Sequence, residues 1–116
     1  MLGSELRIFD SQFAINQFSG NRSILVNILE KFILQYQDFE SLMAQHVQQS
    51  DIETVKRQVH DLKGVSSNLG LIALNQACKD LEVDLTCQIT NDTLDNFSLI
   101  LRQTLGLLRD YSSENS

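Results

Sequence analysis

The 116-residue chain contains no proline and no tryptophan, and it has only two cysteines and five glycines. Because proline interrupts helices, its absence favours long helices joined by short turns. No apolar run in the sequence approaches the roughly 20 residues of a membrane-spanning helix. The N-terminus also lacks a basic segment followed by an apolar core, which a secretory signal would have. From these absences we expect a cytoplasmic protein that does not enter a membrane.

Basic residues are in the minority, with nine lysines and arginines against 15 aspartates and glutamates and a net charge of −6. This balance argues against nucleic acid as the main partner, because binding to a phosphate backbone needs a basic surface. It argues equally against an anionic membrane surface. Apolar residues make up 42% of the chain, as is typical of globular proteins. We expect one monomeric domain over residues 1–116.

The two cysteines, Cys78 and Cys87, fall nine residues apart in one predicted helix. Nine steps of about 100° place them on opposite sides of that helix and roughly 13 Å apart along its axis. They cannot form a disulfide with each other in that arrangement. We interpret them as reduced thiols in or near the core. No cysteine and histidine cluster has the spacing of a zinc site, so neither a metal nor a cofactor is expected on this chain.

Apolar residues recur with a spacing near 3.6 along the sequence, which predicts an all-α fold. The predicted helices cover residues 10–18, 22–48, 51–69, 71–87 and a stretch beginning at the turn 90–92, with residues 112–116 frayed. Asn21 and the run Ser50 to Glu53 supply capping signals. Gly70 suits the left-handed turn after a helix end. Four long amphipathic helices with short links predict an antiparallel up-down four-helix bundle, with the short first helix across one end.

One face of the third predicted helix carries polar side chains and a glycine that the packing of a helical bundle does not require. At about 100° per residue, His60 falls roughly 140° from the centre of the apolar stripe, so its ring should face water. Lys56, Lys63, Gly64 and Ser67 share that face within about 60° of His60. A glycine inside a helix costs roughly 1 kcal/mol relative to alanine. We infer that another molecule approaches the helix closely at Gly64.

These side chains together suit phosphoryl transfer. A neutral imidazole nitrogen of His60 is a good nucleophile near neutral pH. Lys63, assisted by Lys56, is placed to accompany the charge of a phosphoryl group. Gly64 leaves room for the active site of a partner, and Ser67 is small and can donate a hydrogen bond.

The segment from His60 to Gly70 resembles the signature of histidine-containing phosphotransfer (HPt) domains. That signature reads His-x-x-Lys-Gly, followed by small residues and by a glycine at the tenth position after the histidine. His60, Lys63, Gly64, Ser67 and Gly70 match it, and the order of the predicted helices is similar to the family architecture. The resemblance implies that His60 is phosphorylated, that Lys63 steadies the phosphate and that Gly64 clears access for a receiver domain.

The resemblance also implies the partners and the reaction. The partners would be response-regulator receiver domains and a hybrid sensor histidine kinase, with Mg²⁺ bound by the receiver domain. The protein would be a phosphorelay intermediate without kinase activity of its own. The contact should be modest and mostly apolar with a polar rim. Exposed apolar residues of the first helix and of the flanks of the second and third are the candidates for it.

Two other functions compete with this interpretation. In one, the bundle docks a receiver domain and sequesters it, and His60 is never phosphorylated. In the other, His60 is the general base of a helical enzyme. Such an enzyme needs a concave pocket and a second polar group oriented to the imidazole, and the sequence suggests neither. His46 lacks the Lys-Gly context, so we interpret it as an ordinary solvated residue.

Overall fold

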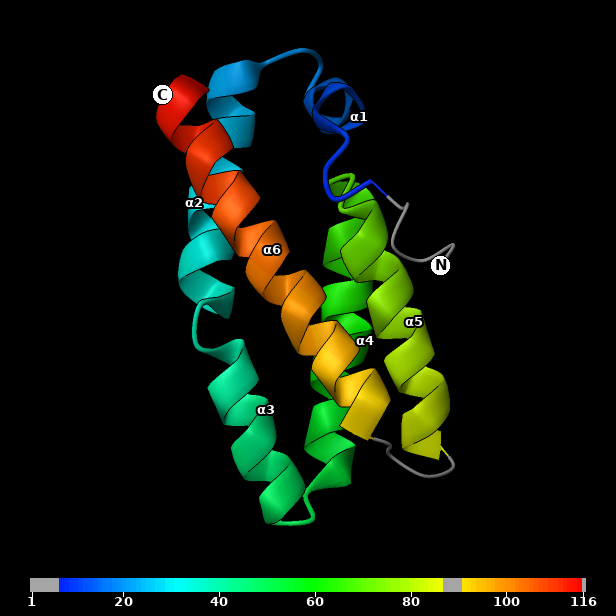
Figure 1. Ribbon diagram of the computed structural model, residues 1–116. Helices are drawn as coiled ribbons and strands as arrows, with labels where there is room; N and C mark the ends of the chain where they lie inside the picture. The colour runs from blue at the N-terminus through cyan, green and yellow to red at the C-terminus, as the bar shows by residue number, and fades with distance from the viewer. Residues whose placement is uncertain (1–6, 87–90, 116) are drawn as a thin grey trace.

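A computed structural model describes residues 7–86 and 91–115 of the chain. All regular secondary structure in these two ranges is helical, which confirms the predicted all-α class. The helices are α1 (Ser11–Gln17), α2 (Arg22–Tyr36), α3 (Phe39–Gln48), α4 (Ile52–Asn68), α5 (Ile72–Thr86) and α6 (Asn91–Asn115). They form a bundle, and short links join the consecutive helices from α1 to α5 (Figure 1). None of the helices in these ranges is both long and apolar enough to cross a membrane.

The single helix predicted over residues 22–48 is wrong, because the chain forms two helices there. α2 ends at Tyr36, and Asp38 leaves the helical conformation with φ −106° and ψ 8° before α3 begins at Phe39. The rings of Tyr36 and Phe39 meet across this break with centroids 5.4 Å apart. Aspartate favours the position before a helix over its interior. The apolar spacing gave no sign of the break because residues on both sides of it are buried in one core.

The C-terminal end also differs from its prediction. Residues 112–115 belong to α6 rather than to a frayed tail, and Ser116 lies outside the described residues. Ser112 is buried, and its hydroxyl donates a hydrogen bond to the Glu30 carboxylate of α2 at 2.9 Å. The Tyr111 ring packs edge-on against Phe9 with centroids 5.2 Å apart. These tertiary contacts hold the last turns of α6 in place.

The starts of the helices follow capping chemistry. Asn21 accepts a hydrogen bond from the backbone N–H of Ile24 at 3.1 Å, as its predicted capping role requires. The cap of α4 is Asp51 rather than Ser50, and its carboxylate accepts from the backbone N–H of Thr54. Ser50 has a φ of +59° because it forms the turn that closes α3. A residue in that left-handed conformation cannot adopt the extended conformation of an N-cap.

The core is a continuous apolar cluster to which all the described helices contribute. α4 packs mainly against α5, α5 against α6, and α6 against α2, while α3 packs against α4. The predicted inward stripe of α4 is buried at Val55, Val59 and Leu62. Cys78 is a free, fully buried thiol, and burial raises its pKa to about 12. Cys87, the predicted end of the fourth helix, lies outside the described residues.

Candidate functional site

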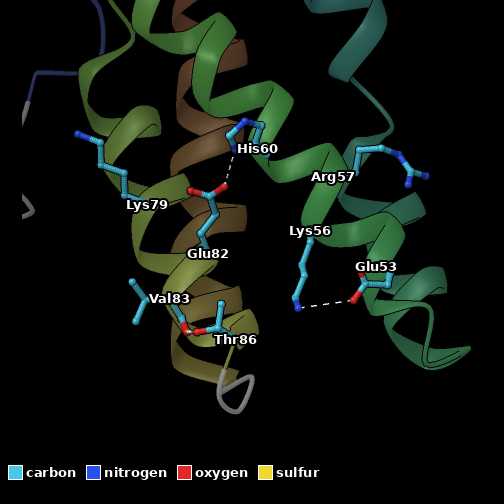
Figure 2. Close-up of a pocket in the computed structure, with 8 residues that line it drawn as sticks. All are labelled: Glu53, Lys56, Arg57, His60, Lys79, Glu82, Val83 and Thr86. Carbon is cyan, nitrogen blue, oxygen red and sulfur yellow. Dashed lines mark hydrogen bonds and ion pairs between the residues drawn. The ribbon is translucent and has the colours of Figure 1, made fainter.

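His60 lies in the middle of α4, on the side that faces solvent. Its side chain is 69% exposed, as the helical wheel predicts. Its neighbours Val59 and Leu62 are completely buried on the opposite side of the same helix. The ring is therefore accessible to another protein, while the backbone that carries it is anchored in the core (Figure 2).

One carboxylate from the neighbouring helix joins His60 to Lys63. Glu82 of α5 places Oε2 3.1 Å from Nδ1 of His60 and Oε1 2.6 Å from Nζ of Lys63. Both oxygens of Glu82 are thus engaged, one by each partner. The side chains of Glu82 and Lys63 are only 25% and 29% exposed. Lys63 is therefore held near the imidazole through Glu82, a contact that the sequence did not predict.

The contacts of Glu82 determine its charge. Partial burial raises the pKa of the carboxyl group, but the hydrogen bonds to Lys63 and His60 and the charge of Lys63 together lower it by more. The net effect is a pKa below the usual value, so Glu82 is an anion at neutral pH. An ionised carboxylate only accepts hydrogen bonds, so this contact favours the tautomer of His60 with its proton on Nδ1. The lone pair of the neutral ring then resides on Nε2.

Glu82 was not among the predicted site residues, because it stands 22 residues after His60 on a different helix. A geometric signal was nonetheless present. α4 and α5 lie side by side and meet at the Gly70 turn. Two helices joined by a tight turn bring residues at similar separations from that turn next to each other. His60 is ten residues before Gly70 and Glu82 is twelve residues after it.

Gly64 is exposed, and a Cβ atom added to it would meet nothing within 4 Å among the described residues. No internal packing in that part of the chain requires a glycine there. Gly70 is different, because it has a φ of +68° and an added Cβ would lie 2.7 Å from the Asp10 carbonyl oxygen. Its own carbonyl accepts a hydrogen bond from the Asp10 N–H at 2.8 Å. Gly70 therefore closes α4 and also admits the segment that leads into α1.

An open groove of about 790 Å³ runs beside His60, between α4 and α5 (Figure 2). Val83 lies in it with 65% of its surface exposed. Its full lining is Glu53, Lys56, Arg57, His60, Lys79, Glu82, Val83 and Thr86. The groove and Glu82 correct the expectation that His60 has neither a hollow beside it nor an oriented polar partner. In residues 7–86 and 91–115, no three side chains of the metal-binding types come together as a metal site.

Comparison with known protein families gives one match. The family model described as Hpt domain matches residues 27–110, which is well over half of the chain. The chain belongs to the HPt family. Members of this family are helical bundles that act in phosphorelay signalling as phosphotransfer intermediates rather than kinases, and that interact with receiver domains and kinases. No curated protein and no solved structure matched the chain.

Lys56 and Ser67, which were predicted to share the face of His60, lie in different surroundings. Lys56 lines the groove, and its Nζ lies 3.6 Å from the Glu53 carboxylate. Ser67 lies two turns beyond His60 and lines a different hollow, together with Phe13 and Ile72. Phe13 and Ile72 are 41% and 40% exposed. This HPt domain therefore has exposed apolar side chains at the α1 end of α4, where α1 was expected to supply them, as well as at Val83.

Proposed function

We propose that this HPt domain is a phosphorelay intermediate whose His60 carries the phosphoryl group between receiver domains. His60 accepts the group from an aspartyl phosphate on one receiver domain and passes it to an aspartate on another. The observation that carries the proposal is the state of the His60 ring: it is 69% exposed, and its Nδ1 is already bound by Glu82. Nε2 is then the nitrogen left to react with a partner.

The transfer step needs no proton movement through solvent. Nε2 of His60 attacks the phosphorus atom, a nitrogen–phosphorus bond forms, and the bond from phosphorus to the receiver carboxylate oxygen breaks. The proton on Nδ1 remains in place, so the ring becomes a phosphorylated imidazolium and the receiver regains its carboxylate. The reverse step delivers the group to the next receiver domain. Mg²⁺ would be bound by the receiver domains, and this chain would contribute no cofactor.

The other predicted site residues would assist in different ways. The ammonium of Lys63 can turn from Glu82 towards a phosphoryl oxygen, and Lys56 can approach from the groove. Gly64 would leave open the path along which the receiver domain reaches the ring, because no side chain projects there. Ser67 would contact the partner near the hollow at Phe13 rather than touch the phosphoryl group.

We also propose an arrangement of the helices, a domain extent and an oligomeric state for the protein. An antiparallel up-down bundle would have four long elements, with α1 across one end (Figure 1). The first element would be α2 followed by α3, and the other three would be α4, α5 and α6. The continuous core from α1 to α6 supports a single domain over residues 1–116. We propose that it works as a monomer in the cytoplasm, where it would meet receiver domains and a hybrid sensor histidine kinase.

The decisive experiment is incubation of the protein with a panel of labelled phospho-receiver domains. The label should move to the chain in a form that acid destroys and alkali preserves, as expected for a phosphoramidate. His60→Gln should abolish labelling but keep receiver binding, whereas the control His46→Gln on α3 should behave as wild type. Receiver binding by a wild-type chain that never takes up label would refute the transfer and favour a module that sequesters its receiver.

A further inference from the structure

We propose that Asn75 of α5 is a positioning residue of the transfer reaction: its side-chain amide holds the backbone of α4 in place at Lys63 and Gly64. This inference rests on the proposed function. Asn75 lies outside the His-x-x-Lys-Gly signature, on the helix that packs beside α4 (Figure 1). Its side chain binds the backbone of Lys63, so it would act on the reaction through the position of that residue.

The first support is the hydrogen bonding of the Lys63 carbonyl oxygen. Asn75 Nδ2 donates to this oxygen from α5 at 2.9 Å, and Ser66 Oγ donates to it from α4, also at 2.9 Å. A carbonyl oxygen only accepts hydrogen bonds, so the nitrogen of the Asn75 amide must be the atom that faces it. Ser66 bonds within its own helix, whereas Asn75 joins α4 to α5. We call this hydrogen bond of Asn75 to the Lys63 carbonyl the Asn75 contact.

The second support is the weakness of α4 at this turn. Gly64 lowers the stability of the helix through its backbone freedom, and it has no side chain to pack against a neighbour. Between Leu62 and Leu69, the residue of α4 that is completely buried is Ser66, which is small and polar. A serine buries less apolar surface than a leucine, so the hydrophobic effect anchors this turn less strongly than the turns beside it. The Asn75 contact compensates, because the turn cannot open without breaking it.

The third support is the way in which Lys63 is expected to act. Its ammonium binds Glu82, which also binds His60. Under the proposed function, the ammonium also pairs with a phosphoryl oxygen and adjusts its position to do so. The Asn75 contact involves the carbonyl of Lys63 rather than its ammonium, so it persists while the side chain moves. It would keep both Lys63 and His60 in position for the reaction, which matters because small displacements of reacting groups slow a reaction strongly.

The experiment compares Asn75→Ala with the matched control Gln76→Ala. Both substitutions remove a side-chain amide from α5, but the Gln76 amide donates to Asp80 of its own helix at 3.0 Å. Single-turnover transfer to His60 would be measured over a range of phospho-receiver concentrations. We expect Asn75→Ala to lower the saturating rate about fivefold, the factor that corresponds to one hydrogen bond of typical net strength. The half-saturating concentration should not change, and Gln76→Ala should match the wild type in both quantities.

The separate measurement of rate and half-saturation distinguishes positioning from two other roles. Asn75 also lines the hollow that contains Phe13 and Ile72. If Asn75 were a docking contact, Asn75→Ala would raise the half-saturating concentration and leave the saturating rate unchanged. If Asn75 only stabilised the fold, the substitution would lower the urea midpoint of unfolding and change neither kinetic quantity. Either result would show that the inference is wrong.

Amide hydrogen exchange tests the Asn75 contact without any phosphoryl transfer. In an α-helix the backbone N–H of Ser67 bonds the carbonyl of Lys63, four residues earlier. Asn75→Ala should make this N–H exchange about fivefold faster than in the wild type, because the turn opens more easily. Adding Gly64→Ala should return the exchange to near the wild-type rate, since alanine strengthens the helix by a similar factor. Exchange that Asn75→Ala leaves unchanged would contradict the inference.

The two measurements also distinguish the failure of this inference from that of the proposed function. A wild-type chain that accepts no phosphoryl group would contradict the proposed function, even if hydrogen exchange shows that the Asn75 contact holds the turn. Normal transfer by an Asn75→Ala chain whose Ser67 N–H exchanges faster would contradict only the role of Asn75 in the reaction.

Discussion

Replacement of Gly64 by alanine tests the reason for a helix-destabilising residue in the middle of α4. A Cβ at this position meets nothing within 4 Å among the described residues, so alanine should add helix propensity without creating strain. The expected gain is about 1 kcal/mol in the free energy of unfolding. For a domain of this size, that gain corresponds to about 4 °C in unfolding temperature.

The same methyl group should impede the reaction. It stands one helical turn from His60, on the exposed face where a receiver domain must approach. A displacement of about 1 Å between reacting atoms can reduce a rate by roughly 100-fold, so we expect transfer to slow between about 10-fold and 100-fold. Stability would be measured by urea titration with thermal unfolding, and transfer by single-turnover labelling from a phospho-receiver.

The chain offers a matched control for this experiment. Gly106 in α6 is also a helical glycine, and an added Cβ there also meets nothing within 4 Å among the described residues. Gly106→Ala should therefore stabilise the protein by a similar amount and leave transfer unchanged. Unimpaired transfer by a stabilised Gly64→Ala variant would show that our steric reason for this glycine is wrong.

Three further predictions concern stability. Gly70→Ala should lower the free energy of unfolding by roughly 2 kcal/mol or more in urea titration. The substitution forces a side chain into a left-handed conformation and against the Asp10 carbonyl. A decrease of less than about 0.5 kcal/mol, as for an ordinary surface substitution, would refute this prediction. Ser112→Ala should cost about 1 kcal/mol by removing the hydrogen bond to Glu30, whereas a truly frayed end would show no change. The pKa of Glu82 is lowered in the folded protein, so its contribution to stability is present above the ordinary carboxyl pKa and is lost as the pH falls through the lower, folded value. Glu82→Gln should therefore flatten the acid limb of the stability curve, and an identical limb in both proteins would contradict the ion-pair assignment.

The faces of the helices were predictable from the sequence because burial follows a simple period. His60 is exposed and Val59 is buried as the helical wheel predicts, since a 3.6-residue repeat fixes which side of α4 meets the core. The helix ends were less predictable. The break before Phe39 preserves the apolar period, so the period does not reveal it. Serine is a common N-cap residue, but Ser50 adopts a left-handed conformation in the turn after α3.

The missing part of the site was a relation between helices. A one-dimensional pattern places Lys63 near His60, because both belong to α4. It does not state which residue of α5 faces them, because that depends on the packing of the two helices. The Gly70 turn indicates which stretch of α5 lies near His60, but only the packing of α4 against α5 defines the contacts of Glu82 with His60 and Lys63.

This engagement bears on how a phosphoryl carrier can release what it accepts. A relay intermediate must hold the group for a limited time, since a very stable phosphohistidine would stop the flow to the next receiver domain. When Lys63 pairs with a phosphoryl oxygen, its ammonium is shared between that oxygen and Glu82, with which it makes a 2.6 Å contact. The phosphorylated state therefore gains less from Lys63 than a free lysine would provide. Under the proposed function, the contact of Glu82 with Lys63 thus limits how tightly the phosphoryl group is retained.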